Sequence, residues 1–115
     1  LWDELRLPPT GTGRSSYLYL NHGCALGSRA YMRKALGDRA VVLSSRDALR
    51  GGLWGPGPIR PDVNERIGDL LLLTRQTNAL FYPYWKDAAP SDLVGGRHGG
   101  LSQHEMLIPL FCCRL

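Results

Sequence analysis

Asp69-Leu70-Leu71-Leu72-Leu73-Thr74 is the clearest strand pattern in this 115-residue chain. Gly68 precedes it, and the polar residues Gln76-Thr77-Asn78, typical of a tight turn, follow it. Four consecutive leucines in so short a segment are typical of a β-strand that is buried on both faces. We therefore predict a buried strand over residues 69–74.

The segments around this strand predict further regular elements. Apolar and aromatic runs predict strands, and residues 26–36 have the apolar spacing of an amphipathic helix that ends at Gly37. A turn after Thr74 predicts a hairpin between residues 70–74 and 79–82. The other predicted strands cover residues 16–20, 40–43 and 107–113, and short helices are predicted through Arg50 and over residues 62–67.

Two stretches are predicted to lack regular structure. Residues 1–15 contain Pro8-Pro9-Thr10-Gly11-Thr12-Gly13, a cluster of breakers, and we interpret them as an irregular lead-in. Residues 86–97 are polar and glycine-rich and predict a loop. Residues 16–115 then form a single α/β domain, a small mixed β-sheet of four or five strands with helices packed on its faces.

Composition excludes several classes of protein. A hydrophobic fraction of 43% argues against disorder, and the longest apolar run is far shorter than the ~20 residues of a membrane span. The chain starts without a basic segment followed by an apolar one, so we expect no signal peptide and a cytoplasmic location. The three cysteines lack a C-x-x-C pattern and are interpreted as small buried apolar residues in a reducing compartment.

The net charge of +4 comes from 12 arginines and 2 lysines against 10 acidic residues. The arginines are scattered along the chain and form no basic block, which argues against a nucleic-acid-binding protein.

The segment Gly96-Arg97-His98-Gly99-Gly100-Leu101-Ser102 is the candidate functional motif. A histidine followed by two glycines can approach a crowded metal site, because the two glycines have no side chains that would clash there. A neutral imidazole is also a good zinc ligand. Ser102 and Glu105 have the spacing of a helix capping box. The alternative is that His98 is an ordinary exposed loop histidine.

Other polar residues are interpreted as structural. The serines Ser44, Ser45 and Ser102 are predicted to cap helices, because no base is placed beside any of them. Asp69 is predicted to be a structural cap at the start of its strand, and His22 a turn residue.

Four segments, in this order, resemble the C-terminal part of the type I phosphodiesterase/nucleotide pyrophosphatase group of the alkaline phosphatase superfamily. They are Leu43-Ser44-Ser45-Arg46-Asp47-Ala48-Leu49, Gly52-Leu53-Trp54-Gly55-Pro56, Arg66-Ile67-Gly68-Asp69 and the motif at 96–102 with Glu105-Met106. The resemblance covers residues 17–115, and its most specific part is the last segment. It implies that the sheet belongs to a three-layer α/β/α sandwich.

The resemblance implies phosphoester hydrolysis at two metal ions, zinc or manganese, with a Thr or Ser nucleophile. It makes His98 a metal ligand, and we expect Arg97 to bind a substrate phosphate by a bidentate contact. The nucleophile and the other ligands correspond to no residue here and would lie in an N-terminal catalytic part outside this chain. Because a catalytic zinc needs about three protein ligands, we expect little or no hydrolytic activity from these 115 residues alone.

A second hypothesis belongs to another class of protein. The chain would be a non-catalytic α/β interaction module that associates with a partner domain or with itself as a homo-oligomer. Its leucine-rich strand and the segment Phe111-Cys112-Cys113 would then expose an apolar surface where neighbours are absent.

Overall fold

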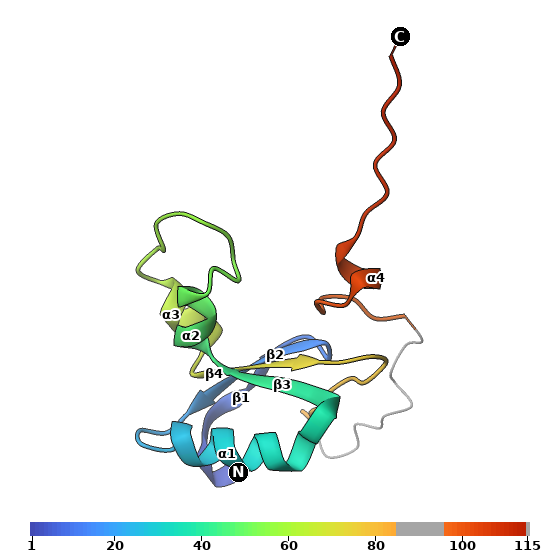
Figure 1. Cartoon of the computed structure of the whole chain (residues 1–115). Coiled ribbons are helices and arrows are strands. Elements are labelled where there is room, and N and C mark those ends of the chain that lie inside the picture. The colour runs from blue at the N-terminus through green and yellow to red at the C-terminus, as the bar shows by residue number, and fades with distance from the viewer. Residues whose placement is uncertain (85–95, 115) are drawn as a thin grey trace.

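The computed structural model describes residues 1–84 and 96–114, and a four-stranded antiparallel sheet lies at its centre (Figure 1). The strands follow the order β1-β2-β4-β3 across the sheet. Their bounds are Leu5–Gly11 for β1, Ser15–Leu20 for β2, Ala40–Ser44 for β3 and Leu70–Thr74 for β4. The strands predicted over 16–20, 40–43 and 69–74 are therefore confirmed.

The helices are short, apart from the first. Their bounds are Ala25–Leu36 for α1, Ser45–Arg50 for α2, Val63–Ile67 for α3 and Gln103–Met106 for α4, with 3-10 turns η1 at Trp2–Glu4 and η2 at Gly37–Arg39. The amphipathic helix and its end at Gly37 are confirmed, as are the short helices before Gly51 and Gly68. No helix in the two described ranges is long and apolar enough to cross a bilayer.

The α/β class is confirmed, but the described pairings of the sheet are all antiparallel rather than mixed. The reason is the position of β4. It pairs antiparallel with both β2 and β3, so these two strands run in the same direction and are connected through α1. The strand-helix-strand order predicted from the sequence is therefore present, but β4 lies between β2 and β3 in the sheet.

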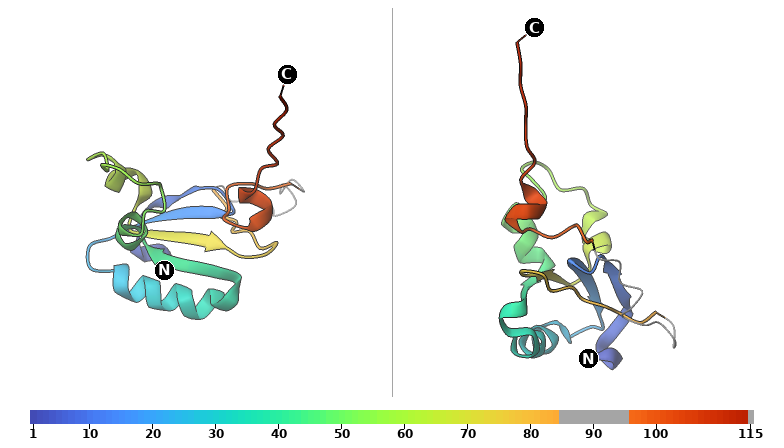
Figure 2. Two further views of the ribbon diagram at one scale, coloured as in Figure 1. Left: turned by 45° about the horizontal axis from the view of Figure 1, so that its top comes forward. Right: turned by 90° about the vertical axis from the view of Figure 1, so that its right-hand side faces the viewer.

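One face of the sheet packs against α1 (Figure 2). The core cluster joins Met32 of α1 to alternate residues of β2, β3 and β4, namely Leu18, Leu20, Val42, Leu70 and Leu72. Leu71 faces the other side and is 1% exposed, so β4 is buried on both faces as predicted. α2 and α3 lie beyond one end of the strands and α4 beyond the other (Figures 1 and 2).

The prediction that residues 1–15 are irregular is wrong for residues 5–11, which form β1. Pro8 and Pro9 lie in this strand because it is at the edge of the sheet, where a missing backbone N–H costs little. Register shifts between Leu5 and Thr10 accommodate the two prolines. The sheet therefore begins about ten residues earlier than predicted.

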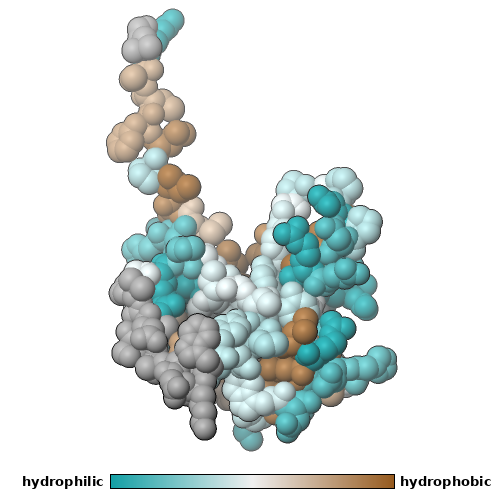
Figure 3. Space-filling view, turned by 180° about the vertical axis from the view of Figure 1, so that it is seen from behind, coloured by the Kyte–Doolittle hydropathy of each residue, from teal (hydrophilic) through white to brown (hydrophobic). Residues whose placement is uncertain are grey.

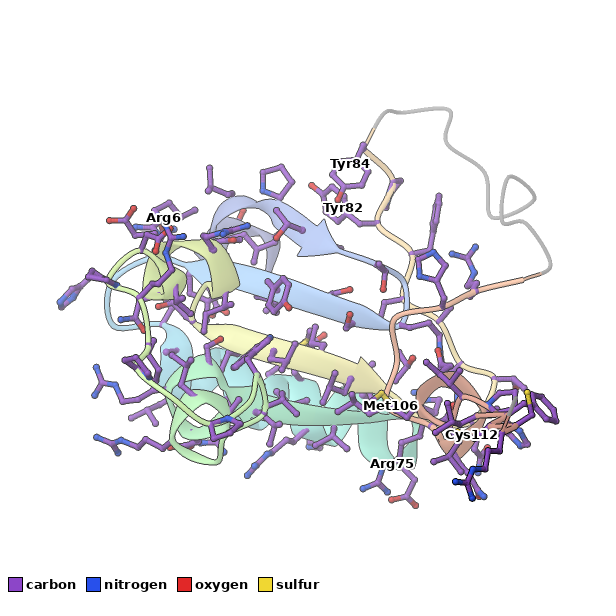
Figure 4. All side chains as sticks on the ribbon, turned by 90° about the horizontal axis from the view of Figure 1, so that it is seen from above. Arg6, Arg75, Tyr82, Tyr84, Met106 and Cys112 are labelled. Atoms are coloured by element: carbon purple, nitrogen blue, oxygen red, sulfur yellow. The ribbon has the colours of Figure 1, made fainter. Side chains whose placement is uncertain are left out.

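The predicted hairpin between 70–74 and 79–82 is also wrong. Both edges of β4 are occupied, by β2 and β3, so no hydrogen-bonding edge is left for residues 79–82. The turn itself is present, and the chain then crosses the end of the sheet, where the Leu80 N–H donates to the Gly13 carbonyl. Tyr82 stacks edge-on with Trp2 and with Tyr84, and the two tyrosines lie side by side (Figure 4).

The last predicted strand, 107–113, is not formed among the described residues. The segment after α4 extends away from the body of the molecule (Figure 1), and its surface is largely apolar (Figure 3). Cys112 and Cys113 are exposed and Cys24 is half-buried, so the expectation that the cysteines are buried is wrong, although all three are free thiols. Of the predicted loop 86–97, residues 86–95 lie outside the described residues.

Candidate functional site

The loop 96–102 lies on the turn between β1 and β2, at the end of the sheet where β4 finishes. Gly99 has a φ of +90°, and a Cβ at this position would lie 3.1 Å from the hydroxyl oxygen of Thr12. The same Thr12 oxygen accepts hydrogen bonds from the N–H groups of Arg14 and Ser15, so the turn is rigid where the loop contacts it. Glycine is required at 99 both by its conformation and by this close approach.

Arg14 joins the loop to the sheet through a buried ion pair. Its Nε donates to Oε1 of Glu105 at 2.9 Å and its Nη2 to Oε2 at 2.7 Å, a bidentate pair between side chains that are 6% and 12% exposed. Its Nη1 donates to the hydroxyl of Thr74 at 2.9 Å and to the carbonyl of Asn78. Arg14 therefore connects the end of β4, the following turn and helix α4.

Glu105 receives two further hydrogen bonds from its own segment. The Ser102 hydroxyl donates to Oε2 at 2.5 Å and the Gly100 N–H to Oε1 at 3.0 Å. The hydrogen bonds from Arg14, then those from Ser102 and Gly100, hold the pKa of Glu105 well below its ordinary value, although burial opposes them. The hydrogen bonds that Arg14 donates to Glu105 likewise raise the pKa of Arg14, although burial opposes them. The ion pair is therefore fully charged at neutral pH.

Gly100 is buried against this carboxylate. A Cβ on Gly100 would lie 2.5 Å from Oε2 of Glu105, a separation that real Cβ atoms do not reach. Gly99 and Gly100 are thus explained by how the loop folds: Gly99 by its backbone conformation and Gly100 by the carboxylate beside it.

Arg97 and His98 are the motif residues that this anchoring does not explain. Both are exposed, and within residues 1–84 and 96–114 neither forms a hydrogen bond or an ion pair. Arg97 lines an open cavity of about 650 Å³ with Gln76, Thr77 and His104. The loop is therefore a fixed backbone segment that presents one imidazole and one guanidinium without using either to hold itself together.

The described residues do not form a complete metal site. They contain no cluster of three His, Cys, Asp or Glu side chains that could hold an ion. His98 fits the role of one ligand, since an exposed imidazole on a rigid loop is available for coordination, but a catalytic zinc needs about three protein ligands. A metal at His98 would require ligands from outside the described residues.

The other residues considered from sequence are structural, with two differences. Asp69 is structural as predicted, because its Oδ2 accepts from the Leu20 N–H at 2.7 Å, and Ser44 caps α2 by accepting from the Asp47 N–H. Ser45 does not cap a helix; its hydroxyl donates to the carbonyl of Ile67. Ser102 precedes α4, but its hydroxyl donates to Glu105 instead of accepting from the backbone. His22 lies exposed in a turn, as predicted.

Sequence reasoning missed the contribution of Arg14. Arg14 and Glu105 are 91 positions apart, and no local pattern links them. The signal available in the sequence was the spacing of Ser102 and Glu105. A glutamate whose carboxylate turns back onto its own loop can also form an ion pair with an arginine that is distant in the sequence.

Comparisons of the chain with protein families, with curated proteins and with solved structures each found no match. The function is therefore argued from the residues and the geometry of the loop.

Proposed function

We propose that this chain is the C-terminal segment of a metal-dependent phosphodiesterase or nucleotide pyrophosphatase. In this proposal it completes one side of a three-layer α/β/α sandwich and contributes His98 as one metal ligand. The nucleophile and the remaining ligands come from an N-terminal catalytic part. The free thiols fit a reducing, cytoplasmic location.

One observation carries the proposal: the loop is anchored by residues other than the two that could do chemistry. Gly99, Gly100 and Glu105 fix the backbone through Thr12 and Arg14. A surface loop with no function has no need of a buried bidentate ion pair, whereas a metal ligand must be held in place before the metal arrives. The resemblance of this motif to the phosphodiesterase group supports the same assignment.

Each exposed residue then has a distinct part. The His98 imidazole, neutral when it coordinates, would hold one of two ions, zinc or manganese, which when bound neutralise charge on the phosphoryl oxygens. The Arg97 guanidinium can hold two oxygens of a phosphate mono- or diester by a bidentate contact. The chain provides no nucleophile in this proposal, so the 115 residues alone would hydrolyse little or no phosphoester.

The test uses the enzyme that this proposal places around the chain, assayed with a chromogenic phosphodiester. We expect His98→Ala to lower kcat/KM by about 100-fold or more, because even partners outside the ligand shell contribute ~10–100-fold to metal affinity or activity. His22→Ala, at an exposed turn histidine outside the cavity that Arg97 lines, is the matched control and should keep the wild-type rate. Equal rates for wild type and His98→Ala would refute the proposal.

Arg97→Lys separates substrate binding from charge alone. A lysine keeps the positive charge but loses the bidentate contact, so we expect a higher KM with little change in kcat. An unchanged KM would show that Arg97 does not bind the substrate by a bidentate contact.

The segment after α4 favours the second candidate function, an interaction module. Its apolar side chains are almost fully exposed: Leu107 is 66%, Ile108 85%, Leu110 86% and Phe111 91% exposed. Contiguous exposed apolar side chains are typical of association surfaces, here for a partner domain or a second copy of the chain. In size-exclusion chromatography with light scattering, Ile108→Asp should dissociate an oligomer that Leu26→Asp, at an exposed leucine of α1, leaves intact. A monomeric wild-type chain would exclude self-association.

A further inference from the structure

A second cavity lies at the opposite end of the strands from the loop 96–102. It measures about 700 Å³ and is lined by residues of α1, α2 and α3 and by the ends of β3 and β4. The sheet register places Ser44 beside Leu70 at this end and Ala40 beside Thr74 at the other. Four residues of strand, about 13 Å, separate the two ends, so this cavity is not part of the proposed metal site.

Three arginines line this cavity, which we call the arginine cavity. Arg46 and Arg50 are four positions apart on α2, so their side chains lie on one face of the helix. Arg29 comes from α1, on the other side of the cavity. Guanidinium groups from two helices thus meet around one hollow.

The carboxylates in the same cavity are already engaged. Asp69 accepts the Leu20 N–H at 2.7 Å, and Asp47 lies 3.5 Å from Nη1 of Arg29, the length of a weak ion pair. Three arginines against two aspartates leave a net positive charge. Among the described residues, the guanidinium groups of Arg46 and Arg50 form no hydrogen bond or ion pair.

Arg29 itself is incompletely satisfied. Its Nε is buried and has no hydrogen-bond partner, the one such side-chain atom found within the described ranges. Buried donors without partners are rare in folded proteins. Because Nε is shielded, a ligand would contact the guanidinium through its terminal nitrogens.

We propose that the arginine cavity binds the phosphate group of a small molecule. Guanidinium forks match the oxygens of a phosphate in pairs, and Arg46 with Arg50 provide two such forks on one helix face. The exposed Asn64 amide and the Ser44 hydroxyl, which also line the cavity, can donate to remaining phosphate oxygens. The volume lies within the range of small-molecule sites. Inorganic phosphate and a nucleoside monophosphate both carry the phosphate group that the arginine cavity would bind.

The experiment is a ¹H–¹⁵N NMR titration of the 115-residue chain with inorganic phosphate, and separately with AMP, at constant ionic strength. We expect saturable shifts of amide signals in α2 and at Asn64, whereas signals of the loop 96–102 stay in place. Arg46→Gln/Arg50→Gln should weaken binding about tenfold or more, as the loss of charge-assisted hydrogen bonds requires. Circular dichroism verifies that the variant is folded.

The matched control is Arg6→Gln/Arg75→Gln, which removes the same charge from exposed arginines outside the arginine cavity (Figure 4). It should bind like the wild type. Equal weakening in both double variants would show attraction by net charge alone and would overturn the proposal, as would the absence of saturable shifts in the wild type. Binding of AMP as well as phosphate assigns the site to phosphate esters, and binding of phosphate alone assigns it to the free anion.

Discussion

At the scale of single residues, the loop 96–102 is held by the contact between Arg14 and Glu105. The bidentate pair is buried, and the Ser102 hydroxyl and Gly100 N–H complete the coordination of the carboxylate. The sequence predicted a capping box at Ser102 and Glu105, but α4 has no side-chain cap, and the Ser102 hydroxyl donates to the Glu105 carboxylate instead. The sequence could not predict Arg14, since an ion pair across 91 positions depends on how the sheet brings the two segments together.

The lowered pKa of Glu105 predicts a pH-dependent stability. The folded chain binds this proton at lower pH than the unfolded chain, whose glutamate pKa is about 4.3. The stabilisation is therefore complete above that pH and is lost as pH falls towards the lower folded pKa. In urea unfolding from pH 7 downwards, Glu105→Gln should be less stable than wild type at pH 7 and lose less on acidification below about pH 4.3.

Glu65→Gln is the control for this experiment, because Glu65 lies exposed on α3. It should keep the acid dependence of the wild type. If Glu105→Gln and wild type lost stability in parallel on acidification, the ion pair would not stabilise the fold.

A second residue-scale prediction concerns the two outer glycines of the motif. Gly100→Ala should destabilise the chain by about 1–3 kcal/mol, because its Cβ has no room beside the Glu105 carboxylate. Gly96→Ala meets no atom within 4 Å and should be neutral. Thermal or urea unfolding measures both, and equal stabilities for the two variants would mean that the loop is not packed as described.

At the scale of elements, whether a predicted strand forms depends on the edges available to it. The leucines of β4 predicted a strand buried on both faces, and this is correct: Leu70 and Leu72 pack in the core with α1, and Leu71, on the other face, is 1% exposed. Residues 79–82 have an equally good strand composition but cannot form a hairpin with β4, because β2 and β3 occupy both of its edges. Composition reports the tendency of a segment to be extended, and topology decides whether it pairs.

β1 shows the opposite case. Pro8 and Pro9 argued against regular structure, but at the edge of a sheet a strand can contain prolines that a central strand could not. Whether a segment forms an edge strand cannot be inferred from its own residues, because it depends on how the segment pairs with its neighbour, here β2. The prediction of irregular structure therefore could not have been corrected from residues 5–11 alone.

Alanine substitutions at two glycines are expected to change the stability of the chain in opposite directions. Gly27 lies exposed inside α1, and a Cβ there meets nothing within 4 Å, so Gly27→Ala should stabilise the chain by about 0.5–1 kcal/mol. Gly68, between α3 and β4, has a φ of +60°, and its Cβ would lie 2.5 Å from the Leu18 carbonyl oxygen. Gly68→Ala should cost more than about 1–2 kcal/mol. Urea unfolding compares the two, and a stabilising Gly68→Ala would contradict the placement of β4.

At the scale of the whole molecule, order is concentrated in the sheet and α1. The four strands and α1 share one core, whereas the segment after α4 extends away from it with exposed apolar side chains. The segment 107–113 has the composition of a strand but pairs with no strand in the described part of the chain.

Hydrogen exchange tests this distribution of order. In the monomeric chain, amides of β4 should exchange slowest, at the rate of global unfolding, and amides of residues 107–111 should exchange almost as fast as in an unfolded peptide. Mass spectrometry of peptic fragments resolves the two segments. Slow exchange over 107–111 in a monomer would show that this segment packs against the body.

The metal content of the complete enzyme tests the central claim, that the anchored loop presents His98 as a metal ligand. Zinc and manganese would be measured by mass spectrometry in wild type, His98→Ala and the control His22→Ala, purified identically. We expect wild type and His22→Ala to hold two metal ions per chain, as at a two-metal site, and His98→Ala to lose at least one of them. Full metal content in His98→Ala would contradict the claim and would leave His98 an exposed loop residue.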